Sequence, residues 1–461
     1  MKAVLGYLSA ATLLLGGCAT DGQSPASPSP TASVRSALAS VSSDVSEASL
    51  RGYIEKMVSF GTRHTLSDQV SDTRGIGAAR RWVESEFRKM SSDCGNCLEV
   101  ITVQDTVTAP PRVPNPTVVA NAVAIQRGTG DPNRVIIIQG HLDSRVTDVM
   151  NFAADAPGAN DDASGVAAVM EAARILSKRK FGATLVFAAL SGEEQGLHGG
   201  RILAAHAKAQ GWEVLAVLNN DIVGNSHGMA AHIDDRVRVF SEGVRSNESE
   251  AIAAARRSVG GEVDAPSRNL ARYVDAIAEA HMPSFDVSMV YRRDRFSRGG
   301  DQVPMVEAGF PAVRVTEAAE HYHRQHQDLR TENGIVYGDT IEGVDFPYLA
   351  RVTKLNAMTM ASLASGPRPP REVKIDGAVS ANTTVTWAAS EGAASYIVWW
   401  RETTSPVWQH SKLVSGATTT VLENTVIDDW FFGVQAVSAE GYASPVQFAG
   451  VVGAFFPPAA K

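Results

Sequence analysis

Three apolar segments of strand length, each followed closely by a histidine or a carboxylate, limit the folds open to this chain. They are residues 135–138, 184–190 and 214–218. Continuous apolar runs of this length are typical of strands buried on both faces of a parallel sheet. His141, the pair Glu193 and Glu194, and Asp221 follow them. Because parallel α/β sheets place their sites at the carboxyl ends of the strands, we expect these side chains to lie close together.

Helical and strand patterns alternate around these segments. The apolar residues of 74–90, 163–176 and 345–363 recur at helical spacing, and 311–315 reads as a further strand. This alternation predicts an α/β domain over residues 46–365, with a mostly parallel sheet covered by helices on both faces. The predicted fold suits a site built at the strand ends.

A proline-rich linker over residues 366–371 ends this domain. Beyond it the apolar period changes to two, with strand signals at 384–387, 396–400 and 431–437. The early tryptophan and the alternation around Tyr396 resemble a fibronectin type III domain. We therefore predict a small all-β sandwich over residues 372–455. It carries no catalytic cluster, so we interpret it as a binding or spacer module.

The N-terminus has the pattern of an export signal. Lys2 precedes an apolar stretch that ends in Leu15, Gly16, Gly17 and Cys18. Residues 1–17 resemble a bacterial lipoprotein signal, which implies that Cys18 becomes lipidated; an ordinary secretory signal is the alternative. Residues 18–45 are rich in Ser, Pro, Ala and Thr, which predicts a flexible tether. We expect a protein anchored to a bacterial membrane, on the periplasmic or outer-membrane side, or secreted.

Two further cysteines, Cys94 and Cys97, lie three residues apart. In a cytosolic chain this spacing suggests redox chemistry or half of a zinc site. Behind an export signal it favours a local disulfide, and the chain has no second pair to complete a structural zinc site.

The composition is that of a globular protein, with 44% apolar residues. The net charge is −8, and the lysines and arginines are scattered rather than clustered. This distribution argues against nucleic acid as a partner.

Carboxylates and histidines occur in combinations that suit metal chemistry. His141 and Asp143 lie two apart, so that one can bind a metal while the other orients the imidazole. Asp161 and Asp162 precede the helix at 163–176; one can cap it, which leaves the other to bridge two cations. In the pair Glu193 and Glu194, one carboxylate can bind metal while its neighbour accepts a proton from water. Without this context, each feature also has a purely structural interpretation.

Three motifs in this order, Gly140-His141-Leu142-Asp143, the segment 158–165 and Glu193-Glu194, resemble the co-catalytic dizinc exopeptidases of the bacterial leucyl-aminopeptidase and glutamate-carboxypeptidase family. The resemblance covers roughly residues 50–363 and implies two zinc ions and a peptide substrate. By this resemblance, Glu193 is the general acid and base, and Asp143 orients His141. The implied zinc ligands are His141 on one ion, Glu194 on the other, Asp161 between them, and Asp221 as the second terminal carboxylate.

The last ligand of the family pattern is a histidine, for which this chain offers two candidates. We choose His326, which requires residues 329–338 to be an insertion before Asp339; the alternative is His323. Family members carry a threonine after this histidine, and Gln327 replaces it here.

Three functions compete. The leading hypothesis is an aminopeptidase that removes N-terminal residues. A second keeps the metals but acts as a carboxypeptidase or another amide hydrolase. The family also contains cyclotransferases that use one zinc, but the bridging Asp161 and the full ligand set disfavour that branch. A third is a non-catalytic receptor whose sandwich domain binds the ligand; the complete set of ligands and the retained Glu193 argue against it.

Overall fold

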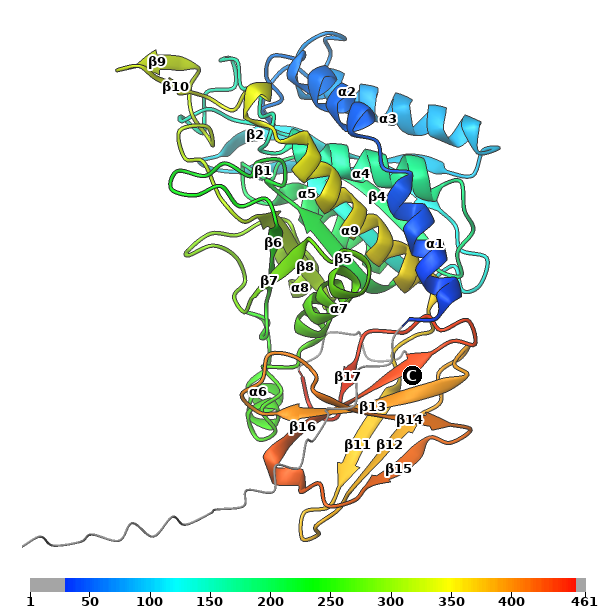
Figure 1. Ribbon diagram of the computed structural model, residues 1–461. Helices are drawn as coiled ribbons and strands as arrows, with labels where there is room; N and C mark the ends of the chain where they lie inside the picture. The colour runs from blue at the N-terminus through cyan, green and yellow to red at the C-terminus, as the bar shows by residue number, and fades with distance from the viewer. Residues whose placement is uncertain (1–29, 453–461) are drawn as a thin grey trace, which may run out of the picture.

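The apolar segments become strands of one eight-stranded sheet in the computed structural model, which describes residues 30–452 (Figure 1). Its four inner strands, β4, β3, β5 and β8, are parallel to one another. On one side, β2 is antiparallel to β4 and to β1; on the other, β6 is antiparallel to β8 and parallel to β7. In spatial order the strands are β1 (Glu99–Ala109), β2 (Val113–Gln126), β4 (Thr184–Leu190), β3 (Arg134–His141), β5 (Glu213–Asn220), β8 (Ala312–Glu317), β6 (Arg236–Ser241) and β7 (Asp286–Val290).

The predicted fold class is confirmed, with helices on both faces of the sheet. Strand β3 is buried along its whole length and contributes side chains to the hydrophobic cores on both faces of the sheet. Ile136 and Ile138 pack in the core under α4 and α9, whereas Val135 and Ile137 pack in the core under α5 and α8. This alternation follows from the two-residue period of a strand. The helices are α4 (Ala163–Leu176) and α9 (Phe346–Ser365) on the first face, and α5 (His198–Ala209) and α8 (Gln302–Glu307) on the second.

The antiparallel strands at the two edges were not predicted. Six of the eleven residues of β1 are exposed and only Val103 is buried, so that its sequence lacks the continuous apolar run of the inner strands. Further helices complete the domain. They are α2 (Glu47–Val58), α3 (Gly75–Asp93), α6 (Glu250–Arg257), α7 (Pro266–His281) and the 3₁₀ turn η1 (Ile341–Gly343).

The tether predicted over residues 18–45 is wrong for its second half. Residues Ala32–Ser43 form helix α1, which packs against α9. Val34, Leu38 and Val41 recur at helical spacing and are buried in the main core. Their burial offsets the low hydrophobicity of the surrounding Ser and Ala residues. The signal segment 1–17, Cys18 and the tether up to residue 29 lie outside the described residues.

The predicted disulfide between Cys94 and Cys97 is confirmed. It closes the loop between the C-terminal end of α3 and β1. Within residues 30–452, no helix combines the length and apolarity that a bilayer crossing requires.

The C-terminal segment forms two antiparallel sheets, as predicted for a sandwich (Figure 1). One has the strand order β11-β12-β15 and the other β14-β13-β16-β17, and their shared core contains Trp387, Val398 and Val434. The elements are β11 (Arg371–Asp376), β12 (Thr383–Ala388), β13 (Ser395–Glu402), β14 (His410–Ser415), β15 (Thr419–Leu422), η2 (Ile427–Asp429), β16 (Trp430–Val437) and β17 (Gln447–Phe448).

Buried polar contacts attach the sandwich to the α/β domain. Asp264 forms ion pairs with Arg272 of α7 at 2.8 Å and with Arg401 of β13 at 2.7 Å. The hydroxyl of Tyr273 donates to the backbone carbonyl of Ala443 at 2.9 Å. In Figure 1 the sandwich lies at the opposite end of the molecule from the short hairpin β9 (Arg330–Glu332) and β10 (Ile335–Tyr337).

Candidate metal centre

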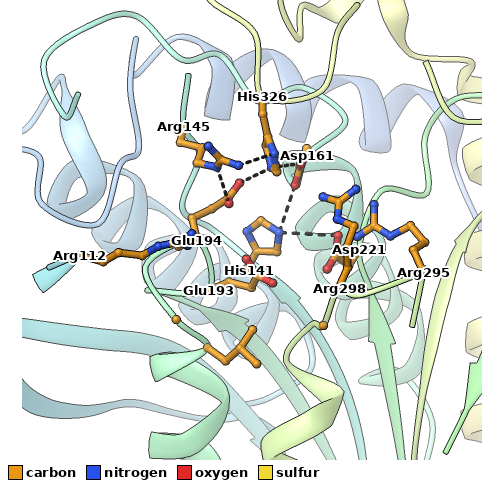
Figure 2. Close-up of a pocket in the computed structure, with 13 residues that line it drawn as sticks. Arg112, His141, Arg145, Asp161, Glu193, Glu194, Asp221, Arg295, Arg298 and His326 are labelled. Carbon is orange, nitrogen blue, oxygen red and sulfur yellow. Dashed lines mark hydrogen bonds and ion pairs between the residues drawn. The ribbon is translucent and has the colours of Figure 1, made fainter. Parts of the chain in front are cut away.

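The carboxyl ends of three adjacent parallel strands meet beside a pocket of about 290 Å³. His141 is the last residue of β3, Glu193 and Glu194 follow β4, and Asp221 follows β5. All four side chains line the pocket, as the strand-end argument predicted (Figure 2).

Two groups of potential metal ligands lie at this place. The first consists of His141, Asp161 and Asp221, whose ligand atoms lie within 4.8 Å of one another. Nε2 of His141 is 3.2 Å from Oδ1 of Asp161 and 3.8 Å from Oδ1 of Asp221. All three side chains are buried.

The second group consists of Asp161, Glu194 and His326. Nε2 of His326 is 2.9 Å from Oδ2 of Asp161 and 2.9 Å from Oε1 of Glu194. Asp161 therefore belongs to both groups, with one carboxylate oxygen in each (Figure 2).

The donor set fits zinc. Imidazole nitrogens and carboxylate oxygens are the ligands of catalytic zinc sites. Although burial lowers the pKa of His326, the carboxylates of Glu194 and Asp161 raise it to about 9. Burial likewise opposes protonation of His141, but the surrounding carboxylates, Asp162 first, raise its pKa well above the usual value. The cluster thus favours positive charge between its carboxylates, where a divalent cation would supply it.

Comparison with known proteins assigns the chain to a family. Residues 121–337 match the sequence model of peptidase family M28. A probable zinc metalloprotease of Leptosphaeria maculans is 46% identical over 411 residues, which cover 88% of this chain and 95% of that protein. A probable zinc metalloprotease of Pyricularia oryzae is 43% identical over 87% of this chain and 82% of its own length. The chain belongs to peptidase family M28. It is a zinc metalloprotease, and hence a hydrolase.

Solved structures of low sequence identity share the fold of this M28 peptidase. LapA of Legionella pneumophila superposes with a TM-score of 0.51 at 19% identity, over 72% of this chain and 76% of LapA. LapB of the same organism gives a TM-score of 0.50 at 16% identity, over 71% of this chain and 75% of LapB.

Glu193 lines the pocket next to both ligand groups. Within residues 30–452 its carboxylate has no hydrogen-bond donor, while its backbone N–H donates to Asp143. Burial, followed by repulsion from Glu194 and Asp221, raises the pKa of Glu193 well above its usual value. The carboxylate is thus free to exchange a proton with a molecule bound in the pocket.

Asp143 orients His141 through a different group from the one predicted. Nδ1 of His141 is 3.0 Å from the backbone oxygen of Asp143 but 3.7 Å from its carboxylate, which is beyond hydrogen-bonding distance. The carboxylate instead accepts from the backbone N–H groups of Glu193 at 3.2 Å and Glu194 at 3.1 Å, and from the hydroxyl of Thr65 at 2.9 Å. It therefore holds the turn that carries the two glutamates.

The adjacent aspartates divide their work as the sequence suggested. Asp162 caps α4 by accepting from the N–H of Gly165 at 3.0 Å, and its other oxygen accepts from the N–H of His141 at 2.9 Å. Asp161 faces the ligand groups. A Cβ on Gly165 would lie 2.4 Å from the backbone oxygen of Asn220, so that only glycine allows this close approach of α4 to β5.

Of the two candidate histidines, the structure brings His326 into the ligand cluster. His323 instead packs against Tyr337 of β10, with ring centroids 4.9 Å apart. The segment 329–338, interpreted from the sequence as an insertion, forms the hairpin β9–β10. Asp339 follows it and accepts from the backbone N–H groups of Asn160 and Asp161, at 3.0 and 2.7 Å. Asp339, directly after the hairpin segment, therefore fixes the loop that carries Asp161.

Two arginines at the centre were not predicted. Arg145 donates from Nε to Glu194 Oε2 at 2.8 Å, and its Nη2 is 2.6 Å from Nδ1 of His326. Arg314 is fully buried in β8 and binds Asp221 at 2.7 Å and Asp294 at 2.8 Å. The sequence does contain a signal for Arg314, because it is a charged residue inside the otherwise apolar segment 311–315. No sequence pattern marks Arg145, which follows His141 by four residues.

Glu317 and Asp301, near the end of β8 and the start of α8, are buried but outside the ligand groups. Glu317 accepts from the side-chain amides of Asn160 and Asn225 and from the backbone of Asn225. Asp301 accepts from the backbone N–H of Gly200 at 3.2 Å. Both carboxylates support the loops around the site.

Proposed function

We propose that this M28 peptidase is an aminopeptidase with two zinc ions, which hydrolyses the first peptide bond of its substrate. The observation that carries the proposal is the position of Asp161, which turns one carboxylate oxygen to each ligand group. A carboxylate shared in this way is typical of two-metal hydrolytic sites. His141 and Asp221 would hold one ion with Asp161, and Glu194 and His326 the other.

The residues of the chain divide the reaction between them. Two bound zinc ions would supply Lewis acidity, which polarises the scissile carbonyl and acidifies water. Glu193 accepts the proton of the attacking water and returns it to the leaving amine. Asp143 keeps Glu193 and Glu194 in their turn through two backbone hydrogen bonds. Arg145 holds Glu194 so that its other oxygen faces Asp161 and His326.

The size and charge of the pocket support the removal of terminal residues. Its volume of about 290 Å³ is at the small end of the range for ligand pockets, which suits one residue rather than a length of chain. The carboxylates of Asp161, Glu193 and Glu194 also give the pocket negative charge, which favours a substrate with a positively charged N-terminus.

Two blocked peptides test this proposal. One has a free N-terminus and an amidated C-terminus, and the other has an acetylated N-terminus and a free C-terminus. Mass spectrometry should show stepwise shortening of the first peptide alone. Shortening of the second peptide alone would contradict the aminopeptidase proposal and support the carboxypeptidase alternative.

We also propose that the protein is exported and anchored to a bacterial membrane through a lipid on Cys18. The disulfide between Cys94 and Cys97 supports this location, because such bonds persist in oxidising compartments. Metabolic labelling with an alkyne fatty acid should mark the wild-type chain and not Cys18→Ser. Equal labelling of the wild-type chain and Cys18→Ser would contradict lipidation at Cys18.

A further inference from the structure

We propose that the pocket recognises a carboxylate on the N-terminal residue of the substrate, with Arg298 as its binding partner, so that the enzyme removes aspartate or glutamate in preference to leucine. This inference rests on the proposed aminopeptidase function and names its substrate class. It comes from the walls of the pocket rather than from the candidate ligands.

The pocket offers little to an apolar side chain. Among residues 30–452, Leu197 is the only apolar residue other than glycine that lines it. A leucine side chain gains binding energy by leaving water for an apolar surface, and a single leucine provides little of it. Apart from the candidate zinc ligands, Glu193 and two glycines, the other lining residues are four arginines. They are Arg112, Arg145, Arg295 and Arg298.

Two of these arginines already have carboxylate partners. Arg145 pairs with Glu194 at 2.8 Å. Arg295 pairs with Asp294 at 3.2 Å and with Glu320 at 3.1 Å. Their charges are balanced within the protein, and their role is to hold neighbouring segments in place.

The other two have charge left for a ligand. With the Gln325 amide in the orientation that satisfies its hydrogen bonds, Arg298 Nη2 donates to the amide oxygen at 3.3 Å, and Arg298 is 4.0 Å from Glu320; both contacts are long. Arg112 donates to the backbone oxygen of Glu194 at 2.7 Å and forms no ion pair with any residue of the described chain. Figure 2 shows the two on opposite sides of the ligand cluster.

Arg298 is the better placed of the two for a substrate carboxylate. Arg112 is already committed to the Glu194 turn through a short hydrogen bond, whereas Arg298 makes only long contacts, with Gln325 and Glu320. The loop that carries Arg298 is fixed by the ion pairs of Arg295. The planar guanidinium of an arginine can bind a carboxylate through two parallel hydrogen bonds.

The test compares p-nitroanilides of glutamate, glutamine and leucine on the zinc-loaded full chain. Hydrogen bonds to charged groups predict that kcat/KM for glutamate exceeds that for glutamine by about tenfold to a hundredfold. Arg298→Gln should reduce this ratio to near one, and Arg298→Lys should give an intermediate ratio. Arg292→Gln is the matched control, because this arginine lies in the same loop, is exposed and does not line the pocket; its ratio should equal the wild-type ratio.

A binding measurement separates this inference from the proposed function. Calorimetry compares isoglutamine, which has a free amine and a side-chain carboxylate, with glutaminamide, which has the same free amine but a neutral side-chain amide. If no anilide is cleaved but isoglutamine binds at least tenfold more tightly, the aminopeptidase proposal fails and carboxylate recognition stands. Equal binding of the two, faster cleavage of the leucine substrate, or an unchanged ratio in Arg298→Gln would overturn the inference.

Discussion

The guanidinium of Arg314 lies 2.7 Å from Oδ1 of Asp221, in an ion pair that is buried on both sides. Burial acts to raise the pKa of Asp221, but Arg314 and then His141 outweigh it and lower the pKa to about 2. The proposed zinc ligand at the end of β5 is thereby kept ionised and in a fixed position.

Arg314→Met should destabilise the fold, because it leaves Asp221 and Asp294 buried without their cation. Removal of one partner of a buried pair costs about 3–5 kcal/mol. Chemical denaturation of the zinc-free protein measures this loss. Arg236→Met is the control, since its ion pair with Asp235 is exposed and should contribute little to stability. Equal stability of the two variants would contradict the role of Arg314.

Asp143→Asn should slow hydrolysis although Asp143 is not in either ligand group. An amide cannot accept from both Glu193 and Glu194, so that the turn between them loosens. We expect kcat/KM to fall by about tenfold to a hundredfold, as for other residues that position metal ligands. Thr65→Val removes only the third hydrogen bond to Asp143 and serves as the comparison. If both variants lose the same activity, Asp143 does not act through the glutamate turn.

Glu193→Gln should keep its zinc and lose hydrolysis of aminoacyl anilides. Proton transfer by a positioned side chain contributes a factor of about 10² to 10⁴, and glutamine cannot take part in it. Elemental analysis and the anilide assay measure the two properties on one sample. The exposed Glu391, changed to Gln, controls for the loss of a charge. Retained turnover in Glu193→Gln would contradict the role of Glu193 in proton transfer. Glu194→Ala, which removes a proposed zinc ligand, should instead lose metal.

Asp275 of α7 should make stability depend on pH. Burial, then repulsion from Glu279 and Asp286, raises the pKa of Asp275 from 3.8 to about 7. The folded state therefore binds this proton more tightly than the unfolded chain. Its stabilising effect is complete below pH 3.8 and is lost as the pH rises through about 7.

Asp275→Asn removes this titration. Relative to wild type, its Tm should be similar at pH 5 or slightly higher, and clearly higher at pH 8, where the wild type must bury a charged carboxylate. Glu423→Gln, at an exposed position, is the control: the difference between its Tm and that of the wild type should not change with pH. The same pH-independent difference in Asp275→Asn would contradict the assignment.

The sequence allowed the inner sheet and much of the centre to be predicted, because burial on both faces leaves continuous apolar runs. His141, Glu194 and Asp221 were found from their positions after those runs. His326 was different, since it follows a loop, adopts a positive φ of 55° and could be chosen only through the family resemblance.

What could not be predicted depends on long-range contacts. The helix Ala32–Ser43 was missed because its three buried residues are spread among Ser and Ala, and packing against α9 and α7 stabilises it. The exposed edge strand β1 has no apolar run to mark it. The carboxylate of Asp143 was assigned to His141 from their proximity in sequence, whereas the fold brings it to the backbone of Glu193, fifty residues away.

Zinc stoichiometry tests the central claim most directly. Elemental analysis of the dialysed chain should give two zinc ions per wild-type molecule and about one in both His141→Ala and His326→Ala. Asp161→Ala, which removes the shared carboxylate, should bind neither ion tightly. One zinc ion per wild-type chain at saturation, or two in Asp161→Ala, would contradict the two-metal centre.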